Sequence, residues 1–143
     1  MADLIEGADI GLALARRILE EVAVAAEQQG LLLSAVVADR AGNPVASIRM
    51  DGAPLGSYAI AADKAFSSAV WNDRTGAMGE IAGPGGEDFG IAGLLGGRMV
   101  VFAGGVPVRT GGRQVGALGV SGARSPEDEA VALAALAACG LEG

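Results

Sequence analysis

Apolar residues recur at four-residue steps near the start of the chain, between Asp9 and Gln29. The recurring residues are Ile10, Leu14, Ile18 and Val22. Charged residues mostly occupy the other positions of this stretch, which is the pattern of an amphipathic helix with one buried face. The pattern predicts a first helix that ends at Gly30.

The end of the chain carries the signals of a last helix. Ser125 has the chemistry of an N-cap, Pro126 suits the first helical position, and Glu127 and Asp128 place negative charge in the first turn. A run of Ala, Leu and Val follows and stops at Gly140. We therefore predict a helix between Ser125 and Gly140.

Two short apolar runs follow the first helix. Residues 31–38 and 45–50 have the composition of strands, and turn-forming residues occupy 39–44, which predicts a hairpin. A second helix is predicted over 57–72. A short third helix is predicted to begin with Thr75 as its N-cap.

The stretch 83–97 contains seven glycines and Pro84, which predicts a long surface loop or lid. Three more strands are predicted at 98–102, 106–109 and 114–120, with the last two paired across a Thr-Gly-Gly turn. This order predicts one α/β domain of the α+β type over residues 1–143. Its antiparallel sheet should have about five strands, with helices packed on it.

Composition indicates that the core is built from small and aliphatic side chains. Hydrophobic residues make up 51% of the 143-residue chain but aromatic residues only 3%, and there are 24 glycines. A chain of this length buries roughly 68–70% of its unfolded surface, which is enough for a real core. We therefore expect helices and strands to approach one another closely.

The formal net charge of -7 disfavours nucleic acid as a partner, because binding to phosphates needs the opposite sign. No apolar run reaches the ~20 residues that span a bilayer. We therefore expect no nucleic-acid or membrane partner, and a cytoplasmic protein.

Cys139 is the single cysteine of the sequence, and the sequence has no histidine. An intrachain disulfide and paired-cysteine metal sites are therefore excluded. Ser-His-Asp catalysis and the usual zinc and haem ligands are excluded as well. No metal site is predicted.

The glycine-rich run 116–122 is superficially like a nucleotide-binding loop or a nucleophile elbow. It lacks the third glycine of the first pattern and the Gly-Lys-Ser/Thr ending of the phosphate loop, and position 123 is Ala where the elbow needs Gly. The glycines instead indicate a strand that passes close to a helix or a ligand.

Lys64, the sequence's single lysine, lies beside Asp63 inside the predicted second helix, where both of their helical stripes contain large apolar residues. A buried lysine could bind an anionic ligand, or act as a base through a lowered pKa. It could equally form a structural pair with a carboxylate or extend its ammonium group to water.

Three other segments allow both a binding and a structural interpretation. Arg49 and Asp51, at a strand end beside a helix start, could recognise a carboxylate or propionate, or be a solvated turn. The adjacent acids 87–88 could coordinate a hard cation or simply be solvated. Pro107 implies an edge or a bulge for segment 104–110, which suits approach to a ligand, pairing with another subunit, or protection of the edge.

Five segments stand in an order and spacing that resembles the GlcG/HbpS family, which includes the C-terminal domain of PduO-type proteins. They are Asp51-Gly52-Ala53, Asp63-Lys64-Ala65, Gly104-Gly105-Val106-Pro107, the run from Gly116 to Gly122, and Pro126-Glu127-Asp128-Glu129. The resemblance extends over essentially the whole chain. It implies a profilin-like sandwich that assembles into dimers or larger homo-oligomers, up to octamers, with some members that bind haem or are associated with corrinoids.

The resemblance also implies a pocket near Lys64. Together with the charged strand end described above, the ligand-binding candidates are Arg49, Asp51, Lys64, Gly105, Pro107, Arg109, Thr110 and Ser121. Because histidine is absent, a haem iron would need another ligand, or the ring would be held by packing and by arginines on its propionates. The candidate substitutes are Met50, Met78, Met99, Tyr58, Cys139, Lys64 and a threonine hydroxyl.

Two classes of function remain open from the sequence. The first is an oligomeric binding module for haem, a corrinoid or another flat or anionic metabolite. The second is a cofactor-independent lyase, isomerase or hydratase acting on a small aromatic or hydroxy acid, with Lys64 and a carboxylate from Asp63, Asp51 or Glu80 as acid and base. A scaffold that only mediates subunit contacts is a third possibility.

Overall fold

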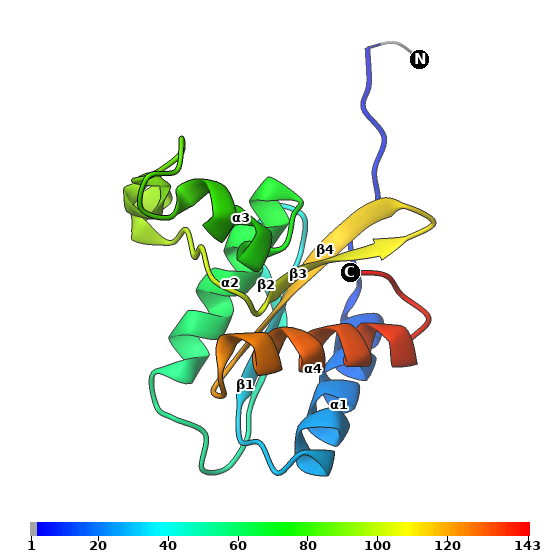
Figure 1. Ribbon diagram of the computed structural model, residues 1–143. Coiled ribbons are helices and arrows are strands. Elements are labelled where there is room, and N and C mark those ends of the chain that lie inside the picture. The colour runs from blue at the N-terminus through cyan, green and yellow to red at the C-terminus, as the bar shows by residue number, and fades with distance from the viewer. Residues whose placement is uncertain (1–2) are drawn as a thin grey trace.

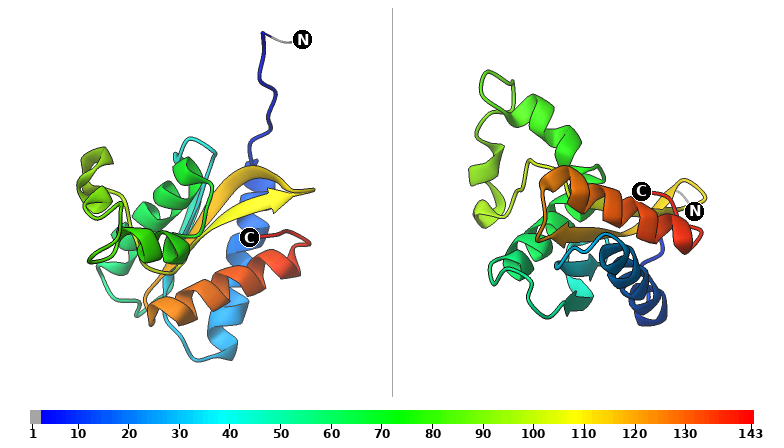
Figure 2. Two further views of the ribbon diagram at one scale, coloured as in Figure 1. Left: turned by 45° about the horizontal axis from the view of Figure 1, so that its top comes forward. Right: turned by 60° about the horizontal axis from the view of Figure 1, so that its bottom comes forward.

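A four-stranded antiparallel sheet separates one helix from two others in the computed structural model, which describes residues 3–143 (Figures 1 and 2). The strands are β1 (Ser34–Ala38), β2 (Pro44–Arg49), β3 (Gly105–Thr110) and β4 (Arg113–Ser121), in the order β2-β1-β4-β3. The helices are α1 (Leu12–Gln28), α2 (Ser57–Trp71), α3 (Thr75–Ala82) and α4 (Ser125–Ala138). Helix α2 covers one face of the sheet, and α1 and α4 cover the other.

Side chains along β1 alternate between the two faces of the sheet, so this strand contributes to the core on each face. Ala35 and Val37 belong to the core shared with α1 and α4, whereas Val36 and Ala38 pack against α2. All four side chains are buried, so this central strand is apolar on both faces. The expected α+β class is confirmed, and the profilin-like assignment stays a prediction.

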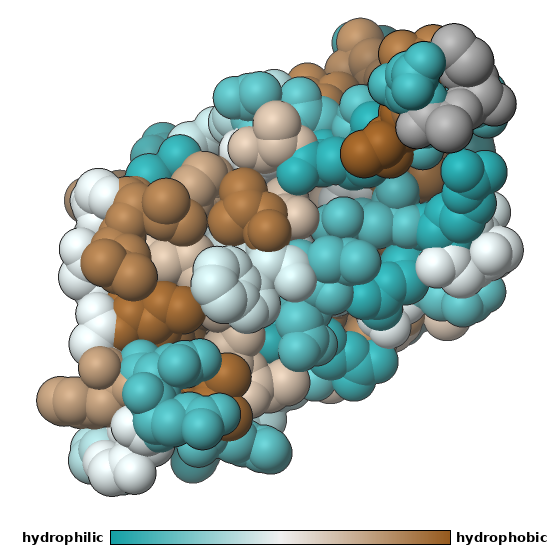
Figure 3. Space-filling view, turned by 90° about the horizontal axis from the view of Figure 1, so that it is seen from above, coloured by the Kyte–Doolittle hydropathy of each residue, from teal (hydrophilic) through white to brown (hydrophobic). Residues whose placement is uncertain are grey.

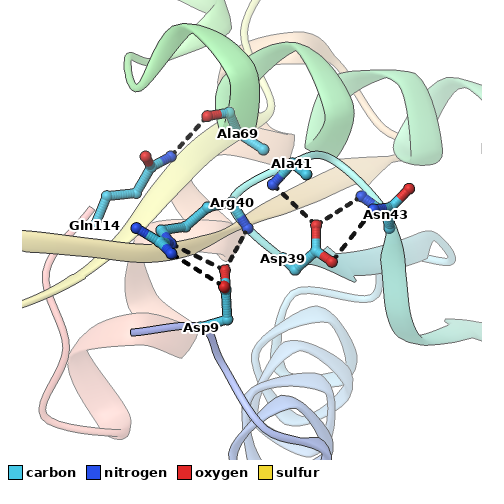
Figure 4. A network of polar contacts seen from close by, with 7 residues as sticks. All are labelled: Asp9, Asp39, Arg40, Ala41, Asn43, Ala69 and Gln114. Carbon is cyan, nitrogen blue, oxygen red and sulfur yellow. Dashed lines mark hydrogen bonds and ion pairs between the residues drawn. The ribbon is translucent and has the colours of Figure 1, made fainter. Parts of the chain in front are cut away.

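The predicted β1–β2 hairpin is confirmed, and its turn is closed by a side chain. The Asp39 carboxylate accepts hydrogen bonds from the backbone N–H groups of Ala41 and Asn43, both at 2.9 Å (Figure 4). Gly42 supplies the left-handed conformation of the turn, with φ of 87°. The turn residues read from the sequence therefore act as expected.

Strand β4 passes very close to α2, as its glycines predicted. A Cβ atom at Gly119 would collide with the backbone carbonyl oxygen of Ala61 and the backbone nitrogen of Ala65. The two alanines are fully buried against the sheet. Small residues on both elements therefore allow the helix backbone to approach the strand backbone.

The prediction of about five strands is wrong, because residues 98–102 do not form a strand. The hydroxyl of Ser67 on α2 accepts a hydrogen bond from the backbone N–H of Val100 at 2.8 Å and lies 2.9 Å from the carbonyl oxygen of Arg98. A side chain thus satisfies backbone groups that a neighbouring strand would otherwise bind.

The N-cap predictions for Thr75 and Ser125 are each wrong by one residue. Both residues are the first of their helices, and Arg74 and Arg124 occupy the cap positions. The Thr75 hydroxyl instead accepts a hydrogen bond from the backbone N–H of Gly105 at 2.9 Å, so it fixes α3 to the start of β3.

The glycine-rich stretch 83–97 is mostly irregular, as predicted, but includes two single 3-10 turns, at Ile91–Gly93 and Leu95–Gly97. Strand β3 lies at the edge of the sheet and has an irregularity between Val108 and Arg109, which agrees with a proline in this strand. No helix in residues 3–143 is both long and apolar enough to cross a membrane.

Candidate ligand site between α2 and the glycine-rich segment

Trp71 and Phe89 flank a hollow of about 480 Å³ between the end of α2 and the segment 83–97. We call this the aromatic hollow; it is lined by Trp71, Asp88, Phe89, Gly90, Ile91 and Leu94. Trp71 is 47% exposed and Phe89 is 69% exposed. The chain has only five aromatic residues, so two of them at one exposed hollow is a strong concentration.

The end of α2 is fixed by a residue from the sheet. Asn72 follows Trp71 in the left-handed conformation, with φ of 55°. The Arg109 guanidinium on β3 donates hydrogen bonds to the backbone carbonyl of Asn72 at 2.8 Å and to its side-chain oxygen at 2.9 Å. Within residues 3–143, Arg109 forms no ion pair with a carboxylate, and its guanidinium binds Asn72, the residue after Trp71.

A small separate core holds the other wall of the hollow. Met78, Ala82, Ile91 and Met99 are buried together, and Phe66 packs against them. This cluster anchors the glycine-rich segment on α3 and α2, although the segment has little regular structure.

Other apolar side chains of this anchored segment remain exposed to solvent. Gly90, with φ of 105°, turns the chain just before the buried Ile91. Phe89 stays exposed on one side of this turn, and Leu94, 60% exposed, on the other. Seen from above, the surface has a broad apolar area at this end of the molecule (Figure 3). An exposed apolar area of this kind usually marks a binding surface.

Lys64 lies in the interior and is 1% exposed. Its ammonium group donates hydrogen bonds to the Val120 carbonyl at 2.9 Å and to the Asp128 carboxylate at 3.1 Å, and the Phe102 ring lies 5.3 Å away. Burial lowers the pKa of Lys64, and the charge of Asp128 acts in the opposite direction. The arrangement is that of a structural ion pair between α2 and α4.

The three catalytic candidates lie apart from one another. Asp63 points to Arg98, with 3.0 Å between its carboxylate and the guanidinium nitrogen, whereas Lys64 binds Asp128. Glu80 is exposed on α3. This geometry favours binding over acid–base catalysis, because a base and an acid must converge on one substrate.

Three of the ligand-binding candidates are buried with Lys64 in the interior of the protein, where they are packed against other residues. Gly105 leaves room for the Lys64 backbone, Ser121 ends β4 with 6% exposure, and Pro107 is buried in β3. Four surface hollows have volumes of about 350, 480, 550 and 460 Å³, and Lys64 lines none of these four.

The remaining candidates line two other hollows. Arg49 and Asp51 lie with Met50 around a hollow of about 460 Å³. Thr110 lines one of about 350 Å³ with polar residues, among them Arg113 and Gln114. Both hollows lack aromatic side chains. Within residues 3–143, no three acidic or cysteine side chains lie close enough together to hold a metal ion.

Sequence reasoning missed the aromatic hollow. Phe89, Ile91 and Leu94 lie in a stretch that its glycines mark as a loop, and Trp71 is one of several apolar residues on α2. The available signal was the scarcity of aromatic residues in the chain, which makes an aromatic residue in a glycine-rich loop unusual.

Residues 10–137 match the family model described as "Haem degrading protein HbpS-like". The chain belongs to the HbpS-like family. Over 129 residues it is 32% identical to an uncharacterized 15.0 kDa protein of the Citrobacter freundii dhaT-dhaS intergenic region, covering 90% of this chain and 91% of that protein. It is also 30% identical to the corrinoid adenosyltransferase PduO of Salmonella typhimurium over 102 residues, 71% of this chain but only 30% of the longer enzyme.

Solved structures of the HbpS-like family have the same fold. A double mutant of Streptomyces reticuli HbpS superposes with a TM-score of 0.85 at 31% identity, over 96% of this chain and 92% of that one. The crystal structure of a PduOC:heme complex superposes with a TM-score of 0.88 at 25% identity, over 93% of this chain and 96% of that one. The expected family is therefore confirmed.

Proposed function

We propose that this protein binds a haem-type tetrapyrrole in the aromatic hollow. The observation that carries the proposal is the pair of exposed aromatic side chains, Trp71 and Phe89, in the lining of one largely apolar hollow. Aromatic rings stack on a flat conjugated macrocycle, and Ile91 and Leu94 add an aliphatic surface. A molecule with a broad apolar face fits this lining better than a small hydrophilic metabolite does.

One carboxylate lines the hollow, and one arginine binds the residue that follows Trp71. Arg109 does not line the hollow, but it would be the cation available to a propionate group at the edge of the ring. Among the lining side chains, the Asp88 carboxylate is the group whose chemistry would allow it to ligate iron, and the sequence has no histidine for this role. A bound haem would supply a redox-active iron, while the residues of this chain would bind and orient the ring mainly by packing.

Relatives support the ligand class. The family description refers to haem, one similar structure is a heme complex, and one relative is a corrinoid adenosyltransferase. Haem and corrinoids share a large tetrapyrrole-derived ring with acidic or amide substituents. Parallel titrations with hemin and with cobalamin would separate the two ligands.

We also propose that the protein works as a homo-oligomer. Large apolar side chains remain exposed on the helices, including Leu12 at 48% on α1 and Ile60 at 40% on α2. Exposed large apolar side chains are costly for a monomer in water, and burial against another copy removes this cost.

Titration with hemin, followed by its Soret absorbance, tests the proposed site. We expect a shifted, saturable band for the unmodified protein, and affinities about tenfold lower for Trp71→Ala and for Phe89→Ala, which corresponds to about 1.4 kcal/mol each. Leu55→Ala is the matched control, since Leu55 is exposed but lies outside the hollow. Unchanged affinity in both aromatic variants would refute the site.

A further inference from the structure

The first described residues form an extended arm that stands clear of the body of the protein (Figures 1 and 2). The arm comprises residues 3–9, of which Glu6, Gly7 and Ala8 line a hollow with Arg40 and Arg113 of the same chain. Leu4 is 70% exposed and Ile5 is 101% exposed, so neither side chain has a place to pack within its own chain. Two adjacent large aliphatic residues held away from the core are unfavourable in water, and this calls for a partner surface.

The base of the arm is firmly attached. Ile10 is buried, and its backbone N–H donates to the Val115 carbonyl at 2.8 Å. The Asp9 carboxylate accepts hydrogen bonds from the backbone N–H of Arg40 at 2.9 Å and from its guanidinium at 3.1 and 3.2 Å (Figure 4). These bonds hold the base of the arm in place. In Figure 1 the arm extends upward from this point and α1 extends downward from it.

A groove suited to such an arm lies between α1 and β2. We call it the α1/β2 groove. Its volume is about 550 Å³, and its lining includes Leu12, Leu19, Ala23, Ala46 and Ile48, with Arg16 and Glu20 also present. Strand β2 is an edge of the sheet, because it pairs with β1 on one side alone within residues 3–143. An open strand edge offers backbone groups to an extended segment.

We propose that the arm of one copy lies in the α1/β2 groove of a second copy. The arm is extended, as a segment that adds to a strand edge must be. Ile5 would enter the apolar groove, and Leu4, on the opposite side of the extended segment, would lie toward the rim. Arg16 and Glu20 place one charge of each sign in the lining, so burial of apolar surface would supply the main stabilisation. The inference rests on the homo-oligomer part of the proposed function and is independent of the tetrapyrrole.

Disulfide trapping tests this contact. Two full-length chains with tags of different length would be produced together, both with Cys139→Ala, one with Ile5→Cys and the other with Ala46→Cys. We expect a mixed dimer on a non-reducing gel, at least about five times more abundant than with Leu55→Cys in place of Ala46→Cys. Equal yields in the two cases would overturn the proposal.

One chain that carries both Ile5→Cys and Ala46→Cys identifies the alternative arrangement. A crosslinked monomer would show that the arm fills its own groove, and this result also overturns the proposal. In a second measurement, Leu4→Ser with Ile5→Ser should lower the mass by light scattering while the circular dichroism spectrum stays the same. An unchanged mass would contradict the exchange of arms.

The outcomes for the arm and for the oligomer are distinguishable. If the unmodified protein is monomeric at every concentration, both the homo-oligomer and the arm contact are refuted. If it is oligomeric but the crosslink does not exceed its control, the arm contact alone is refuted.

Discussion

The Lys64 ammonium group on α2 lies 3.1 Å from the Asp128 carboxylate on α4, and both side chains are almost fully buried. The two helices cover opposite faces of the sheet, so the pair connects the two layers. It lies beside Gly104, the residue that precedes β3. Gly104 makes this possible, because a Cβ atom there would collide with the Lys64 ammonium group. The pair explains why the single lysine is buried without lining any described hollow.

Breaking the pair should destabilise the fold strongly. Asp128→Asn leaves a buried ammonium group without a counter-charge, and we expect the free energy of unfolding to fall by about 3–5 kcal/mol in urea titrations. The double variant Lys64→Met, Asp128→Leu should recover most of this loss. Asp63→Asn is the control, because its exposed pair with Arg98 should contribute less than about 1 kcal/mol. Equal losses in the two single variants would contradict the assignment.

The same pair predicts a pH dependence of stability. Burial holds the pKa of Lys64 below its ordinary value near 10.5 in the folded state. Between the lowered value and the ordinary one, the unfolded chain binds more protons, so the contribution of Lys64 to stability rises with pH. Urea titrations from neutral pH to about pH 10 should show this rise as a difference between the unmodified protein and Lys64→Met. A constant difference over this range would argue against the lowered pKa.

Close packing of β4 on α2 predicts that Gly119 tolerates no side chain. Gly119→Ala would drive a methyl group into the Ala61 carbonyl, and we expect a loss of about 1–3 kcal/mol in thermal unfolding. Gly93→Ala is the matched control, since a methyl group there meets nothing within 4 Å, and its effect should stay within about 0.5 kcal/mol. Similar effects of both substitutions would show that the approach is looser than described.

The hydroxyl of Ser67 should be needed to hold the backbone of residues 98–102 in its observed conformation. Ser67→Ala leaves the N–H of Val100 without its acceptor, and we expect a loss of about 1–3 kcal/mol. Hydrogen exchange at Val100 should accelerate more than exchange in β4 does. Ser47→Ala, at a site where the hydroxyl meets only the exposed Tyr58, serves as the control.

Local chemistry made much of this fold predictable. Turn residues at 39–43 and the Pro-Glu-Asp start of α4 act through neighbours in the sequence, and the turn and the helix start were placed to within a residue, whereas β1 begins three residues later than predicted. Residues 98–102 were misassigned because their hydrogen-bond partner is the Ser67 side chain, 33 residues from Val100, instead of a strand. No periodicity in the sequence encodes such a partner.

The sequence predicted the site less well than it predicted the fold. The sequence indicated that Lys64 or Asp63 faces the interior but left open which one, and the structure buries Lys64. Its partner Asp128 lies 64 residues away and was interpreted as a helix-start residue. Trp71 and Phe89 come together because the core around Ile91 positions the loop. Such a placement depends on tertiary packing, so only the rarity of aromatic residues could have pointed to it.

The fluorescence of Trp71 during a tetrapyrrole titration tests the central claim most directly, because the chain has one tryptophan and it lines the aromatic hollow. We expect hemin to quench this fluorescence to saturation. Iron-free protoporphyrin IX should bind with a Kd within about threefold of that for hemin, since packing and not iron ligation holds the ring. Hemin that binds without quenching Trp71, or a protein that binds neither compound, would contradict the account.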